Sequence, residues 1–102
     1  MKTKYYLSGK ITDITREKEL LNMQKFFFVE ADLVNRGFKV FNPARLEVEG
    51  APWEYYLARD LKWIIDNKPM IYLIDRNWVD SKGARLEVEF AKVLHLQVIG
   101  PL

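Results

Sequence analysis

Short apolar runs alternate along the chain with longer segments in which apolar residues recur every three or four positions. The short runs are bounded by turn residues such as Gly9, Gly37 and Asn42-Pro43, and they predict strands. The longer segments predict helices, one of which starts near Pro52, a residue type favoured at the first helical position. The predicted strands cover 4–8, 38–41, 70–75 and 97–99, and the predicted helices cover about 15–36, 52–66 and 82–95.

Strands and helices that alternate in this order imply a parallel sheet covered by helices on both faces. The sequence therefore predicts a single α/β domain over residues 1–102, a Rossmann-like or flavodoxin-like three-layer sandwich with a small parallel sheet of four to five strands. In such sheets ligands bind beyond the carboxyl ends of the strands. Here those ends are the segments 8–12, 42–52 and 76–83, and we expect the functional site among them.

The first predicted helix is apolar on two opposite sides. One stripe is formed by Leu20, Met23, Phe27, Ala31 and Val34, and the second by Phe26, Val29 and Leu33. One face is expected to pack on the sheet. The second stripe would remain in water in a monomer, where a contiguous apolar patch is unusual, so it predicts a homodimer or a higher homo-oligomer. The alternative is that a loop, such as the segment 44–52, covers it.

Composition narrows the function classes. The 102 residues carry 16 basic and 14 acidic side chains, and a net charge of +2 gives no electrostatic footprint for nucleic acid or an anionic membrane. The absence of cysteine excludes disulfides, zinc–thiolate sites and cysteine nucleophiles, and the single His95 cannot form a multi-histidine metal site. No signal peptide or membrane-spanning run is recognisable, so a cytoplasmic protein is expected.

Two carboxylates occupy unusual positions on the predicted helices. The residues three and four positions from Glu87 are small or apolar, and those around Asp60 are largely apolar, whereas Glu89 has the basic neighbours Arg85 and Lys92. A half-buried carboxylate without a partner is costly, so it often has a function. Pairs of carboxylates around a sugar carbon are the usual equipment for breaking a glycosidic bond. The alternative is that each one caps a loop or pairs with a distant Arg or Lys.

Two loops of small residues are candidates for binding phosphate. Ser81 is a plausible N-cap of the third helix, Gly83 would allow close approach to the backbone, and a helix N-terminus is a natural anion site. The loop Ser8-Gly9-Lys10 is similar and carries a cation. Both are also ordinary features of a helix start and a turn. The chain contains neither a Walker loop nor a G-x-G-x-x-G motif, so nothing supports an NTPase or a dinucleotide-dependent oxidoreductase.

Three motifs resemble those of the nucleoside 2-deoxyribosyltransferase superfamily. The segment Tyr5-Tyr6-Leu7-Ser8-Gly9-Lys10-Ile11-Thr12 is similar to its first strand and nucleotide loop, Arg59-Asp60-Leu61-Lys62-Trp63 to its D-L-x-W helix, and Ser81-Lys82-Gly83-Ala84-Arg85-Leu86-Glu87 to its S-x-G-x-x-x-E motif. The pair Asn42-Pro43 and Trp78 also resemble a small bacterial and phage branch of unknown function. The 2′-deoxynucleoside 5′-phosphate N-hydrolases are better-understood relatives. The order and rough spacing hold over nearly the whole chain.

The resemblance implies catalytic roles for three residues. Glu87 falls on the nucleophile of the superfamily, Asp60 on the aspartate that assists at the sugar or base, and Tyr6 on the aromatic residue near the reacting sugar. The chain is shorter than the transferases, which use later segments to complete a neighbouring subunit's site. Hydrolysis is therefore the first expectation, and transfer across the same bond is the alternative.

The resemblance also implies a substrate-binding set. Ser81 and Gly83 fall on the phosphate contacts of the N-hydrolases, and Gly9 on the loop glycine. The basic residue on the phosphate side of the N-hydrolases has no secure match, although Lys10 or Arg16 could substitute. The set is completed by Ser8, Lys10, Ile11, Asn42 and Trp78.

These observations favour a nucleotide-binding N-glycosidase that acts on a deoxynucleoside 5′-monophosphate or a related nucleotide and needs no metal or organic cofactor. The alternative is a non-catalytic module of the same fold that binds or sequesters a nucleotide, a cyclic nucleotide or an ADP-ribose derivative. A purely structural or interaction protein is the third possibility, and it predicts no affinity for nucleotides.

Overall fold

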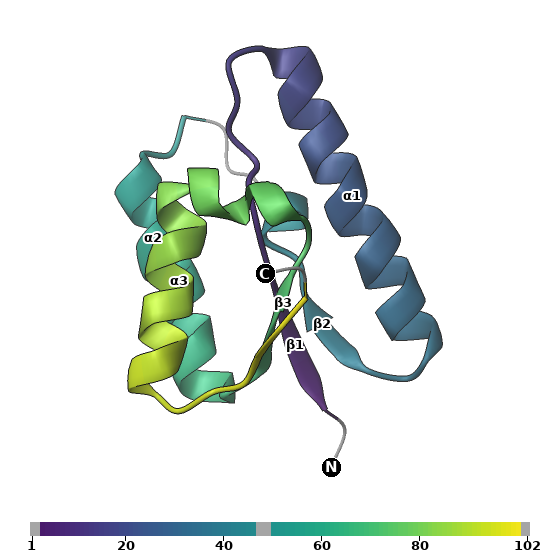
Figure 1. Ribbon diagram of the computed structural model, residues 1–102, viewed down its shortest axis with the longest axis vertical. Helices are drawn as coiled ribbons and strands as arrows, with labels where there is room; N and C mark the ends of the chain where they lie inside the picture. The colour runs from purple at the N-terminus through teal and green to yellow at the C-terminus, as the bar shows by residue number, and fades with distance from the viewer. Residues whose placement is uncertain (1–2, 47–49, 101–102) are drawn as a thin grey trace.

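The computed structural model of the chain describes residues 3–46 and 50–100. Within them, four strands form one sheet in the order β2-β1-β3-β4, and every neighbouring pair is parallel. The predicted α/β fold, with a four-stranded parallel sheet flanked by three helices, is confirmed. The elements in Figure 1 are β1 (Lys4–Ser8), α1 (Arg16–Asn35), β2 (Lys39–Phe41), the 3-10 turn η1 (Pro43–Leu46), α2 (Trp53–Asn67), β3 (Met70–Leu73), the 3-10 turn η2 (Arg76–Asp80), α3 (Lys82–Val93) and β4 (Val98–Ile99).

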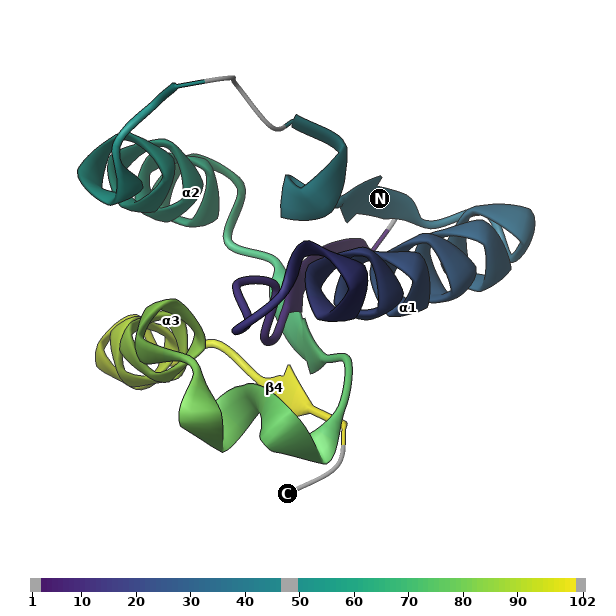
Figure 2. The ribbon, with the colours of Figure 1, turned by 90° about the horizontal axis from the view of Figure 1, so that it is seen from above.

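The helices cover both faces of the sheet, with α1 on one side and α2 and α3 on the other (Figure 2). This follows from the strand order, because the connection through α1 runs one way across the sheet and the connections through α2 and α3 run the other way. The order reverses between β1 and β3. The carboxyl ends of these two strands therefore open the crevice in which doubly wound sheets bind their ligands.

The central strand β1 contributes to two separate cores. Tyr6 and Leu7 are both 0% exposed, and successive strand residues face opposite sides of a sheet. Tyr6 packs with Val88 of α3 on one side, and Leu7 packs with Phe26 of α1 on the other. Ser8 comes two residues after Tyr6 and faces the same side, so two hydroxyl groups of β1 point toward α2 and α3.

The prediction of which side of α1 packs on the sheet is wrong. Phe26 and Leu33 are 1% and 4% exposed, and Val29 packs against the same core. In contrast, Leu20 and Val34 of the stripe expected to pack are 52% and 53% exposed. A homodimer through Phe26, Val29 and Leu33 is therefore excluded by their burial within one chain, while association as such stays a prediction.

A buried polar residue explains this error. Asn22 lies on the packed side of α1, where its amide nitrogen donates to the Ile11 carbonyl at 3.2 Å and to Asp13 Oδ2 at 3.1 Å. Because a polar residue lies among the apolar ones, the sequence pattern did not identify this side as the one that packs on the sheet. The opposite side carries Leu21 and Phe28, which are 55% and 68% exposed. We call this solvent-exposed apolar surface, formed by Leu20, Leu21, Phe28 and Val34, the outer face of α1.

One strand end also differs from the prediction. β3 ends at Leu73 rather than at Asp75, because the Asp75 side chain accepts the backbone N–H of Arg76 at 2.6 Å and caps η2. The predicted loop 76–82 therefore contains a helical turn. Among the described residues, none of the helices combines the length and the apolar character needed to cross a lipid bilayer.

Candidate active site

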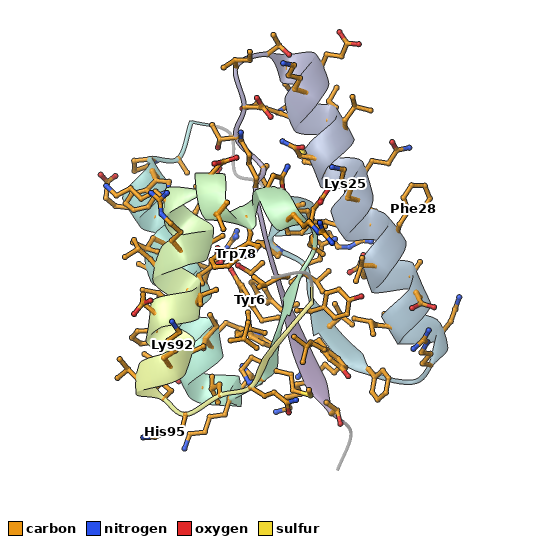
Figure 3. The ribbon with its side chains drawn as sticks, in the orientation of Figure 1. Tyr6, Lys25, Phe28, Trp78, Lys92 and His95 are labelled. Carbon is orange, nitrogen blue, oxygen red and sulfur yellow. The ribbon has the colours of Figure 1, made fainter. Side chains whose placement is uncertain are left out.

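Helix α3 carries Glu87 on the side that packs against the sheet. The helix begins after Ser81, whose Oγ accepts the backbone N–H of Ala84 at 3.2 Å, and Glu87 is 7% exposed. Two hydroxyls of β1 meet its carboxyl group: Ser8 Oγ donates to Oε1 at 2.7 Å, and the Tyr6 hydroxyl donates to Oε2. Tyr6, labelled in Figure 3, lies between the sheet and α3. The central strand thus satisfies both oxygens of a buried carboxyl group.

Asp60 approaches the same tyrosine from α2. It is 7% exposed and near enough to the Tyr6 hydroxyl for that group to lower its pKa, and its Oδ1 lies 2.8 Å from a terminal guanidinium nitrogen of Arg59. The Tyr6 ring is fixed by stacking on Phe41, with centroids 5.4 Å apart, and by a tilted contact with Trp63 at 6.3 Å. A phenol has one proton and can donate to only one acceptor at a time. The Tyr6 hydroxyl therefore links two carboxyl groups that compete for it.

Burial shifts the ionisation of all three groups. Desolvation raises the pKa of Glu87 from 4.5 to about 8, against the opposing effect of the hydrogen bonds from Tyr6 and Ser8. Desolvation also raises the pKa of Asp60, and the adjacent Arg59 opposes it. Burial, together with the nearby Glu87, holds the pKa of Tyr6 well above its usual range. Burial therefore favours the protonated form of Glu87 at neutral pH, while the adjacent Arg59 guanidinium opposes the same effect of burial on Asp60.

Both carboxyl groups line a single cavity of about 200 Å³. The predicted convergence of Glu87 and Asp60 on one cavity at the ligand-binding edge of the sheet is confirmed. This volume is below the roughly 300 Å³ at which pockets for drug-sized ligands begin, so the cavity has room for a small group such as a single sugar ring. Five other residues of the predicted site also lie in its wall: Tyr6, Gly9, Ile11, Ser81 and Gly83.

The two glycines in the cavity wall have different reasons to be glycine. A Cβ atom on Gly9 would lie 3.3 Å from Ile74 Cβ, so close packing of the first loop on the sheet favours glycine there. A Cβ atom on Gly83 would meet only Trp53 Nε1, at 3.8 Å. Packing does not require a glycine at the start of α3, and the small residue leaves that part of the wall open.

Four residues of the predicted binding set do not line the cavity. Ser8 reaches the site only through its hydrogen bond to the buried glutamate, and Lys10 forms a 3.8 Å ion pair within its own loop. Asn42 is 3% exposed and accepts the backbone N–H two residues later at 3.0 Å, which starts η1. Trp78 packs against the core on the α2–α3 side. Arg16, the other candidate for a phosphate-side cation, is largely exposed at the start of α1.

Three side chains near the start of α2 line the cavity without having been predicted as site residues: Trp53, Tyr56 and Arg59. Trp53 is 41% exposed, and the Lys82 amine lies 4.9 Å from the centroid of its ring. A signal for two of them was present in the sequence, because Trp53, Tyr56 and Asp60 fall at positions i, i+3 and i+7 of one helix face. The rest of the wall is formed by Leu7, Thr12, Met23, Pro43, Ala44 and Ala84.

The fold and this site define a small α/β domain with a buried pair of carboxyl groups at the point where the strand order reverses. Residues 3–100 match the family described as "Domain of unknown function (DUF4406)", and the chain belongs to that family. Nothing among the curated proteins matches the chain.

Proposed function

We propose that this protein is a nucleotide N-glycosidase that hydrolyses the bond between base and sugar in a deoxynucleoside 5′-monophosphate or a related nucleotide. The observation that carries the proposal is the pair Glu87 and Asp60, buried in the wall of one sugar-sized cavity and joined through the Tyr6 hydroxyl. Paired carboxyl groups around an anomeric carbon are suited to this chemistry. The resemblance of three motifs to the nucleoside 2-deoxyribosyltransferase superfamily supports the same reaction.

In the proposed reaction a Glu87 oxygen forms a bond to the anomeric carbon while the bond from that carbon to the base nitrogen breaks. The electron pair leaves with the nitrogen, which takes up a proton. Water then attacks the same carbon and gives one proton to the Asp60 carboxylate, the bond from the carbon to Glu87 breaks with its electron pair on the carboxylate, and the products are the free base and the sugar phosphate. The net consumption is one water, so no oxidant or reductant is required.

The Tyr6 hydroxyl donates a hydrogen bond to Glu87 and lies near enough to Asp60 to affect its pKa, so its position suits the proton transfer in this reaction. In the proposed transfer the Tyr6 hydroxyl turns its proton from Glu87 to Asp60, so that its oxygen accepts the proton of Glu87 while its own proton passes to Asp60. This makes Glu87 the carboxylate that attacks and Asp60 the acid that protonates the departing base. A pair of carboxyl groups held in different environments divides acid and nucleophile roles in this way.

For the phosphate we propose the start of α3, where Ser81 and Gly83 line the cavity. Backbone N–H groups and the positive end of the helix dipole favour an anion there. The base would lie toward Trp53 and Tyr56, which line the same cavity and offer aromatic surface.

The test is release of free base from a panel of ribo- and deoxyribonucleoside monophosphates, followed by chromatography. We expect wild type to cleave at least one nucleotide and Glu87→Gln to lose at least roughly 1000-fold of that rate. Glu89→Gln is the matched control, because Glu89 lies on the same helix but is exposed and paired with Lys92 at 3.3 Å. If wild type and Glu87→Gln are equally inert on every nucleotide, hydrolysis is the wrong reaction.

A nucleotide-binding module without turnover is the second candidate, and one observation favours it. A pKa of about 8 leaves Glu87 mostly protonated at neutral pH, and a protonated carboxyl group is a poor nucleophile. Calorimetry with the same panel separates the two functions. Tight binding of a nucleotide that is recovered unchanged would support the binding module.

A further inference from the structure

Arg59 and Asp60 form an ion pair that helix geometry does not produce by itself. Adjacent helical residues point about 100° apart and do not normally face each other. Here Arg59 Nε donates to Asp60 Oδ1 at 2.9 Å, and one terminal nitrogen lies 2.8 Å from the same oxygen. Both contacts fall on the same oxygen, Oδ1. The carboxyl group is held in one orientation by two donors.

The guanidinium group is itself held by two aromatic rings. It lies 5.2 Å from the ring centroid of Tyr56, one turn earlier on α2, and 5.8 Å from that of Phe41, at the end of β2. Contacts of this kind are favourable when the cation is partly desolvated, and the Arg59 side chain is only 20% exposed. Arg59 also lines the cavity. A planar cation is therefore fixed between α2 and β2 at the wall of the candidate site.

Among the residues that the structure describes, the other ionisable groups beside Asp60 carry no positive charge. Tyr6 approaches it from β1 and Glu87 from α3, and both would be negative if they ionised. Two buried carboxyl groups that share one phenol cannot both ionise at low cost unless a cation compensates one of them. Arg59 lies next to Asp60 and so compensates that carboxyl group most directly, while the donors to Glu87 among the described residues are the hydroxyls of Tyr6 and Ser8.

We propose that Arg59 is a positioning residue that acts through Asp60: it fixes the orientation of the Asp60 carboxylate and ensures that the shared proton begins on Glu87. For the part that Asp60 plays toward a substrate, the inference rests on the proposed function. The orientation and the charge of Asp60 in the free protein do not depend on it. In the proposed reaction, the nearby cation also makes protonated Asp60 a readier acid toward the departing base.

The first experiment needs no activity. Protein labelled with ¹³C at aspartate carboxyl groups is titrated by NMR, and Asp60→Asn assigns the signal. We expect the titration midpoint of Asp60 to rise clearly in Arg59→Met, to rise less in Arg59→Lys, and to stay unchanged in Lys62→Met. Lys62 is the matched control, because it lies on the same helix but is exposed and pairs with Asp66 at 3.0 Å. An unchanged midpoint in folded Arg59→Met overturns the inference. Should Arg59→Met not fold, Arg59→Lys decides in the same way.

The second experiment uses base release. We expect Arg59→Met to lower kcat by roughly 100-fold with little change in KM, since misplacing a catalytic group by about 1 Å has an effect of that size. Added guanidinium ion should restore part of kcat in the variant, whereas urea, which is planar but neutral, should not. A fully active Arg59→Met overturns the inference. If wild type releases no base but the Asp60 titration midpoint still rises in Arg59→Met, the proposed glycosidase activity is refuted. The positioning role of Arg59 toward Asp60 then stands on its own.

Discussion

Replacing Glu87 with glutamine should change how the stability of the protein depends on pH. Glutamine has nearly the same shape and is neutral at every pH, so Glu87→Gln removes the ionisation of the buried group and little else. Its amide can still contact the hydroxyls of Tyr6 and Ser8. In wild type these two hydroxyls donate hydrogen bonds to the carboxyl oxygens of Glu87. The two proteins should therefore differ most at the pH values at which wild-type Glu87 must ionise.

The magnitude follows from the pKa of Glu87, which burial raises from 4.5 to about 8. A folded-state pKa above the unfolded one means that the folded state holds its proton more tightly. The contribution to stability is therefore complete below about pH 4.5 and is lost as the pH rises through 8. At about 1.4 kcal/mol per pH unit, the loss reaches about 5 kcal/mol, of which about 4 kcal/mol falls between pH 5 and pH 8.5.

Urea unfolding at a series of pH values from 5 to 8.5 measures this effect, with Glu89→Gln as the control. Wild type and the control should lose stability together as the pH rises. Glu87→Gln should lose about 4 kcal/mol less over the same interval and become the most stable of the three above pH 8. If the curves of wild type and Glu87→Gln are parallel, Glu87 titrates in the folded protein near its ordinary value and is not desolvated.

The remaining predictions concern the reaction and the packing. For base release, kcat/KM should be level near neutral pH and fall tenfold per unit above about pH 8, because the relay needs the proton of Glu87; a rate that rises up to pH 8 would exclude the relay. Tyr6→Phe breaks the link between Glu87 and Asp60, so kcat should fall by roughly 100-fold or more, while denaturant unfolding should detect a loss of only about 1–3 kcal/mol. Phe26→Ala should lower the unfolding free energy by about 3–5 kcal/mol and Phe28→Ala by less than about 0.5 kcal/mol, and equal effects would reverse the assignment of the two faces of α1. If the outer face of α1 forms a dimer interface, wild type should sediment as a dimer and Phe28→Glu as a monomer. A monomeric wild type at high micromolar concentration would refute the dimer prediction.

The fold could be predicted from the sequence because the strands are short apolar runs, whereas in the helices apolar residues recur every three or four positions. The sequence was also sufficient for the position of the two carboxyl groups. Neither Glu87 nor Asp60 has a basic residue three or four positions away, so each had to find its partners beyond its own helical face. The partners of Glu87, in contrast, were not visible in any local pattern. Tyr6 and Ser8 lie 81 and 79 positions from Glu87, and only the resemblance to a family pointed to the tyrosine.

The errors share one physical cause. Periodicity shows that a helix has an apolar side, but local hydrogen bonds decide which residues complete that side. Asn22 is buried because Ile11 and Asp13 accept its amide protons, and no hydrophobicity scale predicts such a pairing. The Asn42 side chain likewise accepts a hydrogen bond from the backbone N–H of Ala44. Its polar character therefore reflects this local bond and did not indicate a binding role in the cavity.

The carboxyl cluster points to function because it replaces apolar residues in the core. Tyr6, Ser8, Asp60 and Glu87 interrupt a core whose other members on that side are apolar. Well-packed apolar residues often serve the stability of a fold equally well or better than buried charged groups. Yet among the described residues every buried side-chain nitrogen and oxygen has a hydrogen-bond partner. The polar groups of the cluster are therefore all satisfied within the fold. Functional sites often depart locally from the rules of core packing. Here polar groups replace apolar ones in the core, hydrogen bonds satisfy them, and the cluster opens on a cavity where the strand order reverses, which is the usual place for a ligand in such a sheet.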